Sequence, residues 1–256
     1  MFIDADDTLN GTFALKALRN NIQTNNGIYQ MCVGVFDEVH ELELNANDGP
    51  ILIPHESDMV WMFGKLYRRT FLNNCNIHFH PTSRANEDNG FNKLCQLVLD
   101  PSTQIKFIPF HVYYWHDSAT SITRANNYSY SFGSSERDSF YGYIENMIFA
   151  IQEAKTRTPI HNPIIEFTTS CMVNIYVQIM ECMIKSPDNA KQNFEWSKRF
   201  YNEVYKNSES LISEEMFSRI YTDIIRNAYS ANKFNGKIPP YSVQEFLNKL
   251  KNGEDI

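Results

Sequence analysis

Two histidines separated by one residue, His78 and His80, are the residues whose spacing most directly suggests chemistry. The segment from Ile77 to His80 is predicted as a short strand that Pro81 ends, and side chains at positions i and i+2 of a strand point to the same face. Two imidazoles on one face can bind one metal ion. The sequence predicts either such a metal site or, more simply, two structural histidines beside the end of a strand.

The motif His78-Phe79-His80-Pro81 resembles the His-x-His-Pro motif of JAMM metalloproteases. This resemblance implies a metal-dependent hydrolase with His78, His80 and Asp88 as the metal ligands, provided that the loop before Asp88 is shorter than in that family. The possible bases are Glu38, Glu41 and Glu56. The same histidines resemble the metal motif of rolling-circle replication endonucleases, with Tyr229 and Lys233 in the place of the nucleophile motif.

An acidic segment at the start of the chain, Asp4-Ala5-Asp6-Asp7-Thr8, resembles the nucleophile motif of haloacid-dehalogenase-type phosphatases. That family places the motif after a buried strand, and only three residues precede it here. Residues 164–169 would imitate the second motif of the family, but no Gly-Asp metal motif follows. The alternative is that Asp7 or Thr8 caps a helix.

Composition excludes several classes of protein. Five widely spaced cysteines without a Cys-x-x-Cys pair argue against a disulfide framework and a structural zinc site. The net charge of -7 argues against nucleic acid as a partner. No apolar run approaches the roughly 20 residues of a membrane span, and the acidic N-terminus is unlike a targeting segment. Phosphate-binding, Gly-x-Ser-x-Gly and dinucleotide-binding motifs are missing from the sequence.

Aromatic residues are unusually frequent, with 14 Tyr, 18 Phe and 3 Trp. Tyrosine combines a rigid apolar ring with a polar hydroxyl, and this combination suits surfaces that partners bury. Tyr128 and Tyr130 lie in a polar stretch where a monomer would expose them. The excess indicates either extensive interfaces or a bias toward AT-rich codons.

The elements that must position these residues indicate an α+β fold, with an antiparallel β-sandwich or a sheet as its core. The predicted helices span residues 7–22, 57–71, 91–99, 136–154, 194–204 and 213–228, with a last short helix that begins at the Ser242 capping box. The predicted strands are a hairpin at 28–44 and single strands at 51–53, 77–80, 105–115, 164–168 and 172–180. We expect a single domain over residues 1–256, with an N-terminal helical arm (1–26), a mixed core (27–185) and a helical C-terminal region (186–256).

The order of elements over about the first 115 residues resembles that of cypovirus polyhedrins, the proteins of viral occlusion bodies. The similarity runs from an N-terminal helix ending at Asn25-Asn26-Gly27 to the strand at 105–115. It implies a sandwich with attached helices, an N-terminal helix that binds neighbouring subunits, and trimers packed into a lattice. It also implies nucleotides at lattice contacts and residence in the cytoplasm of a host cell.

The sequence thus predicts a non-enzymatic, self-assembling structural protein that packages virions, with itself and virus particles as partners and no membrane. The predicted assembly residues are Phe13, Leu18, Tyr128 and Tyr130. No metal and no catalytic residue belong to this interpretation. The alternatives are a JAMM-type hydrolase centred on His78 and His80, and a phage or virus connector or capsid component.

Overall fold

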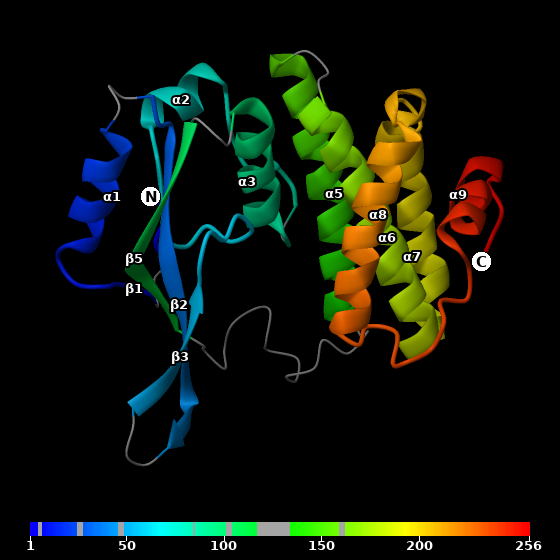
Figure 1. Ribbon diagram of the computed structural model, residues 1–256, viewed down its shortest axis with the longest axis horizontal. Helices are drawn as coiled ribbons and strands as arrows, with labels where there is room; N and C mark the ends of the chain where they lie inside the picture. The colour runs from blue at the N-terminus through cyan, green and yellow to red at the C-terminus, as the bar shows by residue number, and fades with distance from the viewer. Residues whose placement is uncertain are drawn as a thin grey trace. The chain divides into compact units, whose positions relative to one another are not determined.

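The computed structural model describes residues 1–4, 7–24, 28–45, 49–83, 85–100, 104–116, 134–158 and 162–256 (Figure 1). The chain divides into two compact units. Unit 1 comprises Met1–Phe79 and Phe91–Ser129, and unit 2 comprises His80–Gly90 and Tyr130–Ile256. The chain passes between the units after Phe79, inside helix α3 (Glu87–Val98) after Gly90, and after Ser129.

Unit 1 is built around a five-stranded mixed sheet. Its strands are β1 (Thr8–Leu9), β2 (Met31–Asn45), β3 (Gly49–His55), β4 (Lys65–Tyr67) and β5 (Ile105–His116). The order is β1-β5-β2-β3, and β4 pairs with part of β2. β2 and β5 run parallel, and the other pairs are antiparallel. The predicted α+β class is confirmed, and of the two predicted cores the described residues form the sheet.

The central strand β2 is continuous where the sequence predicts a hairpin at residues 28–44. Asp37 and Glu38, which the prediction places at the turn, lie within β2 and pair with both β3 and β5. Histidines face their carboxylates: His111 Nδ1 lies 2.8 Å from Asp37, and His55 Nε2 lies 3.3 Å from Glu38. Pairing with strands from elsewhere in the chain therefore overrides the local turn signal.

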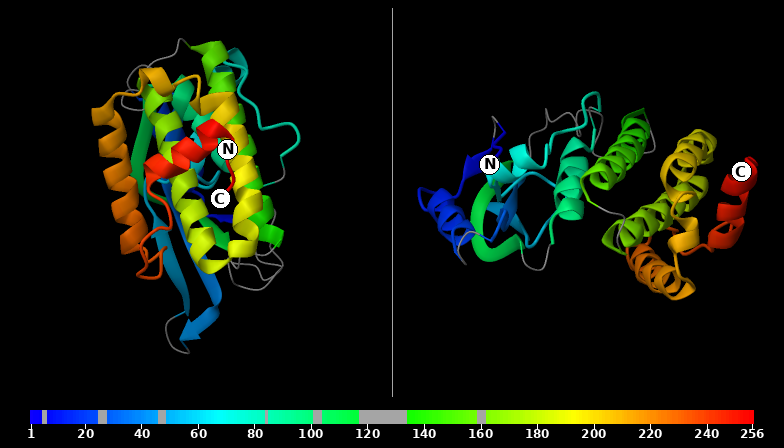
Figure 2. Two further views of the ribbon diagram at one scale, coloured as in Figure 1. Left: turned by 90° about the vertical axis from the view of Figure 1, so that its right-hand side faces the viewer. Right: turned by 90° about the horizontal axis from the view of Figure 1, so that it is seen from above.

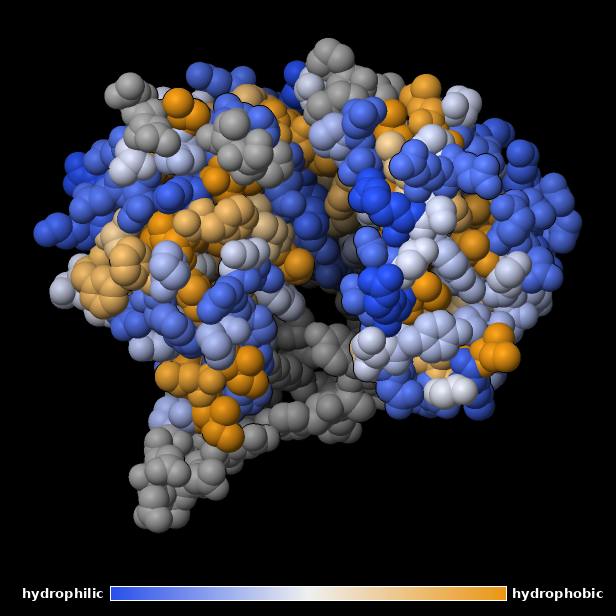
Figure 3. Space-filling model, in the orientation of Figure 1, coloured by the Kyte–Doolittle hydropathy of each residue, from blue (hydrophilic) through white to orange (hydrophobic). Residues whose placement is uncertain are grey.

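Strand β3 forms one edge of the sheet. Apolar surface gathers over it in Figure 3, where Ile51, Leu52 and Ile53 are 39%, 47% and 42% exposed. Pro50 and Pro54 lie in the same strand. Because proline has no backbone N–H, these residues limit the pairing of a further strand at this edge.

Helix α1 (Ala14–Ile22) covers one side of the sheet, and α3 lies on the other side (Figures 1 and 2). The buried face of α1 joins the core of unit 1, which contains Ala14, Leu18, Ile22, Cys32, Phe36, Phe63, Ile108, Val112 and Tyr113. The helix begins later than predicted, because Thr8 and Leu9 pair with β5 and Gly11 turns the chain with φ 68°. The residues predicted to cap the helix therefore form strand β1 or precede it.

Residues 57–71, predicted as one helix, form a loop, strand β4 and the start of α2 (Arg69–Asn74). Ser57 has φ 53°, whereas an N-cap residue needs an extended backbone. Lys65 and Tyr67 pair with β2 instead of continuing a helical turn. Here too, sheet pairing decides between two local possibilities.

Unit 2 is a helical bundle, seen end on in Figure 2. Its helices are α5 (Ser134–Arg157), α6 (Asn162–Lys185), α7 (Pro187–Phe200), α8 (Glu214–Ser230) and α9 (Val243–Asn252), with a π-helical turn at Tyr201–Tyr205 and a 3₁₀ turn at Glu209–Leu211. Helix α6 contacts α5, α7, α8 and α9. No described helix combines the length and the apolar character that crossing a membrane requires.

Helix α6 replaces the two strands predicted at residues 164–168 and 172–180, so this prediction is wrong. The helix is buried on most sides, including Val173, Ile175 and Val177. When a helix is apolar on all sides, its apolar residues can match the two-residue repeat of a strand as well as the 3.6-residue repeat of a helix. The buried hydroxyls fit the helix because each bonds the carbonyl one turn earlier, as Thr168 Oγ1 does with Ile164 O at 2.8 Å.

The last two helices begin where the sequence predicts. Ser213 Oγ accepts a hydrogen bond from Met216 N at 3.2 Å at the start of α8. Ser242 and Glu245 form the predicted capping box of α9. Both predictions are confirmed because capping depends on residues only three positions apart.

The segment His80–Gly90 is anchored to α5 by a buried amide. Asn146 Nδ2 donates to Ser83 Oγ at 2.7 Å, to Ala85 O at 2.8 Å and to Gly142 O at 2.9 Å. A Cβ atom at Gly142 would lie 2.5 Å from Ala85 O, so this contact needs glycine. The amide of Asn146 therefore holds Ser83 and Ala85 against α5 within unit 2.

Candidate functional site

The described residues do not gather the histidines singled out in the sequence into a group of three or more potential metal ligands. Residues 77–80 are not a strand, and His78 is exposed, with Nδ1 donating to the neighbouring Phe79 O at 3.0 Å. Asp88 lies in the first turn of α3, where a carboxylate stabilises the helix dipole. Across the described ranges, no group of three or more His, Cys, Asp or Glu side chains could hold a metal ion.

The side chain of His80 makes hydrogen bonds to the backbone within unit 2. Its Nδ1 accepts hydrogen bonds from the backbone N–H groups of Thr82 at 3.2 Å and Ser83 at 2.9 Å, which makes Nε2 the protonated nitrogen of the neutral ring. Nε2 lies 3.8 Å from Glu145 Oε2. Burial, followed by the charge of Arg199, lowers the pKa of His80 despite this carboxylate. The direction agrees with the geometry, because a proton on Nδ1 would break two hydrogen bonds.

The lowered pKa predicts how stability depends on pH. The unfolded chain binds a proton at His80 with an ordinary pKa of about 6.5, and the folded chain binds it less readily, so the free energy of unfolding falls as pH drops from 7.5 to 5.5. His80→Asn keeps an acceptor for the two N–H groups and removes the titration. We expect a shallower loss of stability for this variant in urea unfolding at several pH values.

The exposed His78 provides the matched control for this experiment. His78→Asn makes the same substitution at an exposed histidine two residues earlier in the chain. Equal pH dependence of wild type and His80→Asn would contradict the role of His80.

The predicted assembly residues lie in different environments. Phe13 is 49% exposed, whereas Leu18 is fully buried in the core of unit 1. Tyr128 and Tyr130 fall outside the described residues.

The polar groups of unit 1 with the most specific arrangement lie where the acidic N-terminal segment meets the carboxyl end of β5. Asp7, which is 9% exposed, accepts hydrogen bonds from Tyr113 Oη at 2.7 Å and from His116 N at 3.0 Å. Thr8 Oγ1 lies 3.1 Å from His116 Nε2. The backbone N–H of Asp4 donates to Tyr113 Oη at 3.2 Å. Pairing of β1 with β5 thus brings two aspartates to the end of a strand more than 100 residues later in the chain.

Tyr113 remains a proton donor in this site. Burial raises its pKa, and its hydrogen bond to Asp7 raises the pKa further. A neutral hydroxyl that donates to a carboxylate holds the carboxylate in one position. The buried Tyr113 therefore fixes the orientation of the Asp7 carboxylate.

Aromatic rings lie next to these acidic residues. The aromatic array consists of Trp61, Phe63, Tyr113 and Trp115, and alternation along β5 places Tyr113 and Trp115 on the same side of the strand. The ring of Phe63 stacks with Trp61, Tyr113 and Trp115 at centroid distances of 6.1, 5.3 and 5.5 Å. Tyr113 belongs to both groups, so it connects the array to Asp7.

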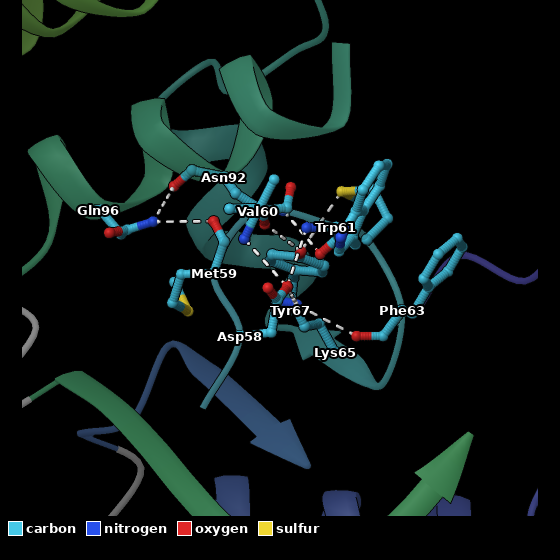
Figure 4. A network of polar contacts seen from close by, with 10 residues as sticks. Asp58, Met59, Val60, Trp61, Phe63, Lys65, Tyr67, Asn92 and Gln96 are labelled. Atoms are coloured by element: carbon cyan, nitrogen blue, oxygen red, sulfur yellow. Dashed lines mark hydrogen bonds and ion pairs between the residues drawn. The ribbon is translucent and has the colours of Figure 1, made fainter. Parts of the chain in front are cut away.

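The loop of residues 58–64, which carries Trp61 and Phe63, is fixed by an ion pair between the fully buried Lys65 and the partly buried Asp58 (Figure 4). Lys65 is fully buried, and its Nζ lies 3.2 Å from Asp58 Oδ1 and 3.2 Å from Phe63 O. Asp58 Oδ1 also accepts hydrogen bonds from the backbone N–H groups of Val60 at 3.0 Å and Trp61 at 2.9 Å. One carboxylate therefore orders the turn and neutralises the buried ammonium.

Helix α3 holds the same loop from the other side (Figure 4). The fully buried Asn92 donates through Nδ2 to the backbone carbonyls of Val60 and Trp61, both at 2.9 Å. Its Oδ1 accepts from Tyr67 Oη at 2.6 Å. Gln96 Nε2 reaches a further carbonyl of the loop at 3.3 Å. The backbone beneath Trp61 thus has buried polar partners on two sides.

The sequence drew attention to only part of this site. The acidic segment with Asp4, Asp6 and Asp7 stands out as a possible motif, whereas Tyr113 and Trp115 appear only as part of the predicted strand at 105–115, and His116 lies just beyond it. Trp61 lay in a segment predicted as a helix. The alternation of aromatic residues along β5 was the one available signal.

The architecture is of the α+β class: an open mixed sheet in which β2 and β5 form the parallel pair, together with packed helices. No family model and no curated protein sequence matches the chain. Among solved structures, the chain is similar to S. aureus TarS, residues 1–349, in complex with UDP. The sequences are 13% identical with a TM-score of 0.53, and the match covers 99% of this chain and 67% of that chain. The two proteins share a fold.

This similarity contradicts the resemblance to cypovirus polyhedrins. The predicted polyhedrin-like, self-assembling viral protein without enzymatic activity is therefore wrong, and the fold does not point to the JAMM-type hydrolase or the virus connector. The resemblance rested on element order, and two of its elements, the hairpin at 28–44 and the helix from Ser57, are absent from the described structure.

Proposed function

We propose that this protein is a glycosyltransferase that uses a uridine-diphosphate sugar as its donor. The observation that carries the proposal is the similarity in fold, over 99% of this chain, to a protein solved with UDP. UDP is the leaving group when a UDP-sugar donates its sugar. In the proposed reaction an acceptor hydroxyl oxygen attacks the anomeric carbon, the bond from that carbon to the diphosphate oxygen breaks, and the hydroxyl proton passes to a base.

The candidate site lies at the carboxyl end of β5, which runs parallel to β2, and in open sheets of parallel strands ligands bind at that end of the strands. Asp7 lies there with Asp4 three residues before it. A diphosphate and two carboxylates repel one another, and a divalent cation such as Mg²⁺, which prefers oxygen ligands, would join them.

The residues present fit such a cation because they include an oriented carboxylate. Asp7 accepts hydrogen bonds from Tyr113 Oη and from the backbone N–H of His116, and these bonds fix the orientation of its carboxylate. Mg²⁺ is commonly held by one or two carboxylates together with phosphates and water, so a complete ring of protein ligands is not required. Asp4 and Asp7 are the residues that would hold it, and it would supply charge neutralisation of the diphosphate.

The test is UDP binding by isothermal titration calorimetry, with and without Mg²⁺. We expect wild type to bind UDP in the presence of Mg²⁺ and Asp7→Asn to bind it at least ~10-fold more weakly, which corresponds to about 1.4 kcal/mol. Asn at position 7 can still accept the bond from Tyr113, so the main loss is the charge.

The control is Asp223→Asn, which removes an exposed carboxylate from α8 in unit 2. It is expected to leave UDP affinity unchanged. Failure of wild type to bind UDP at millimolar concentration, or equal binding by Asp7→Asn, would contradict the proposed function at this site. Release of UDP from UDP-glucose or UDP-N-acetylglucosamine then measures the activity itself.

A further inference from the structure

We infer that Trp61 and Trp115 form a stacking subsite for a sugar ring of the substrate. This inference rests on the proposed function and names which part of the substrate these two side chains contact. Neither residue stood out in the sequence as a candidate for binding.

The first argument is the geometry of the rings. Trp61 and Trp115 lie 5.9 Å apart between centroids with an interplanar angle of 23°, and Phe63 is inclined to them by only 10° and 22°. Near-parallel rings at such separations are offset-stacked. Phe63 is 6% exposed and supports the array from the core, whereas both tryptophans are half-buried. The flat apolar face of a pyranose ring matches a surface of this kind.

The second argument is the rigidity of the support. Asn92 and Lys65 are both fully buried, and their hydrogen bonds hold the backbone around Trp61. Buried polar groups are costly unless they are fully paired, and packing an indole against a core does not by itself require them. A network that fixes the loop preorganises Trp61, which lowers the entropy cost of binding a ligand.

The third argument is the carboxylate beside the array. Tyr113 Oη, at one end of the array, donates to Asp7, and the backbone N–H that follows Trp115 donates to the same carboxylate. Binding sites for small polar ligands combine apolar walls with a few fixed polar groups. A sugar ring has this composition, with apolar faces and a rim of hydroxyl donors. A uracil base could stack on the same surface, and the experiment separates the two.

The experiment uses the intrinsic fluorescence of the full chain. The chain has three tryptophans, so Trp196→Phe leaves Trp61 and Trp115 as its only indoles, and this variant serves as the parent. The ligands are UDP, UDP-glucose, UDP-N-acetylglucosamine and the methyl glycosides of both sugars. We expect the methyl glycosides, at millimolar concentration, to change the fluorescence of the parent. We expect at least one UDP-sugar to bind more tightly than UDP.

Substitutions then assign the contact. Trp61→Phe and Trp115→Phe, and separately both alanine variants, are measured by calorimetry after circular dichroism melting shows that they are folded. If an alanine variant does not fold, the phenylalanine variant at the same position, which keeps an aromatic ring, takes its place in the comparison. We expect the alanine variants to bind the UDP-sugar ~10-fold more weakly and to retain parental affinity for UDP.

Three outcomes overturn the inference. Unchanged UDP-sugar affinity in all four variants would show that the array does not contact the sugar, and the proposed function would still stand. An equal loss of affinity for UDP would identify the stacked ring as the base. Methyl glycosides that leave the parent fluorescence unchanged, together with UDP-sugars that bind no more tightly than UDP, would also overturn it. By contrast, absence of UDP binding with a clear response to methyl glycosides would contradict the proposed donor alone.

Discussion

Replacing Asp58 with alanine is expected to lower the free energy of unfolding by about 3 kcal/mol, because it removes a carboxylate that pairs with a fully buried ammonium. The Asp58 carboxylate lies 3.2 Å from Lys65 Nζ, and the same oxygen orders the turn through Val60 N and Trp61 N. A neutral carbonyl, Phe63 O, is a weaker partner for the charge. Urea unfolding monitored by circular dichroism measures the loss.

The double variant Asp58→Ala/Lys65→Met tests the mechanism behind this loss. Methionine has a similar length to lysine and no charge, so the buried position no longer needs a carboxylate. We expect the double variant to be more stable than Asp58→Ala alone. Additive losses in the two single variants and the double variant would show that the two residues do not interact.

Replacing Asn146 with aspartate should destabilise unit 2 by on the order of 3 to 5 kcal/mol at neutral pH. The side chain is fully buried, and its Nδ2 faces three oxygen acceptors, Ser83 Oγ, Ala85 O and Gly142 O, within 2.9 Å. Aspartate has nearly the same shape, but it would present an oxygen to these acceptors and bury a charge. Thermal unfolding followed by circular dichroism measures the change.

The pH dependence of this variant provides an independent check. Burial of an unpaired carboxylate raises its pKa above that of the unfolded chain, so protonation stabilises the folded state and the loss shrinks as pH falls. This direction is opposite to that expected for His80. Asn207→Asp is the control, because its exposed amide makes a single hydrogen bond at 3.5 Å. Equal losses at positions 146 and 207 would contradict the anchoring role of Asn146.

Several elements could be predicted because local residues determine them. The strand at residues 105–116 follows from a dense run of β-branched and aromatic residues, and α5 follows from helical spacing. The caps at Ser213 and Ser242 depend on a residue three positions away. In each case the interacting residues lie within one turn or one strand, and the printed sequence contains the whole signal.

Other elements could not be predicted, because a distant segment decided between two local possibilities. Residues 172–180 match both a strand and a buried helix, and packing against α5, α7, α8 and α9 selects the helix. Residues 28–44 contain a turn signal at Asp37 that pairing with β3 and β5 overrides. The resemblance to polyhedrins depended on these same ambiguous segments.

The candidate site shows the same division between sequence and tertiary structure. The sequence by itself determined the supply of chemical groups: the acidic segment at Asp4 to Asp7 and the aromatic strand. Only tertiary structure decided that Asp7 meets Tyr113 and that Trp61 stacks beside Trp115. Asp7 and Tyr113 lie 106 positions apart in the sequence, and Trp61 and Trp115 lie 54 positions apart. Strand pairing and burial bring such distant segments together, and a local sequence pattern contains no information about these contacts.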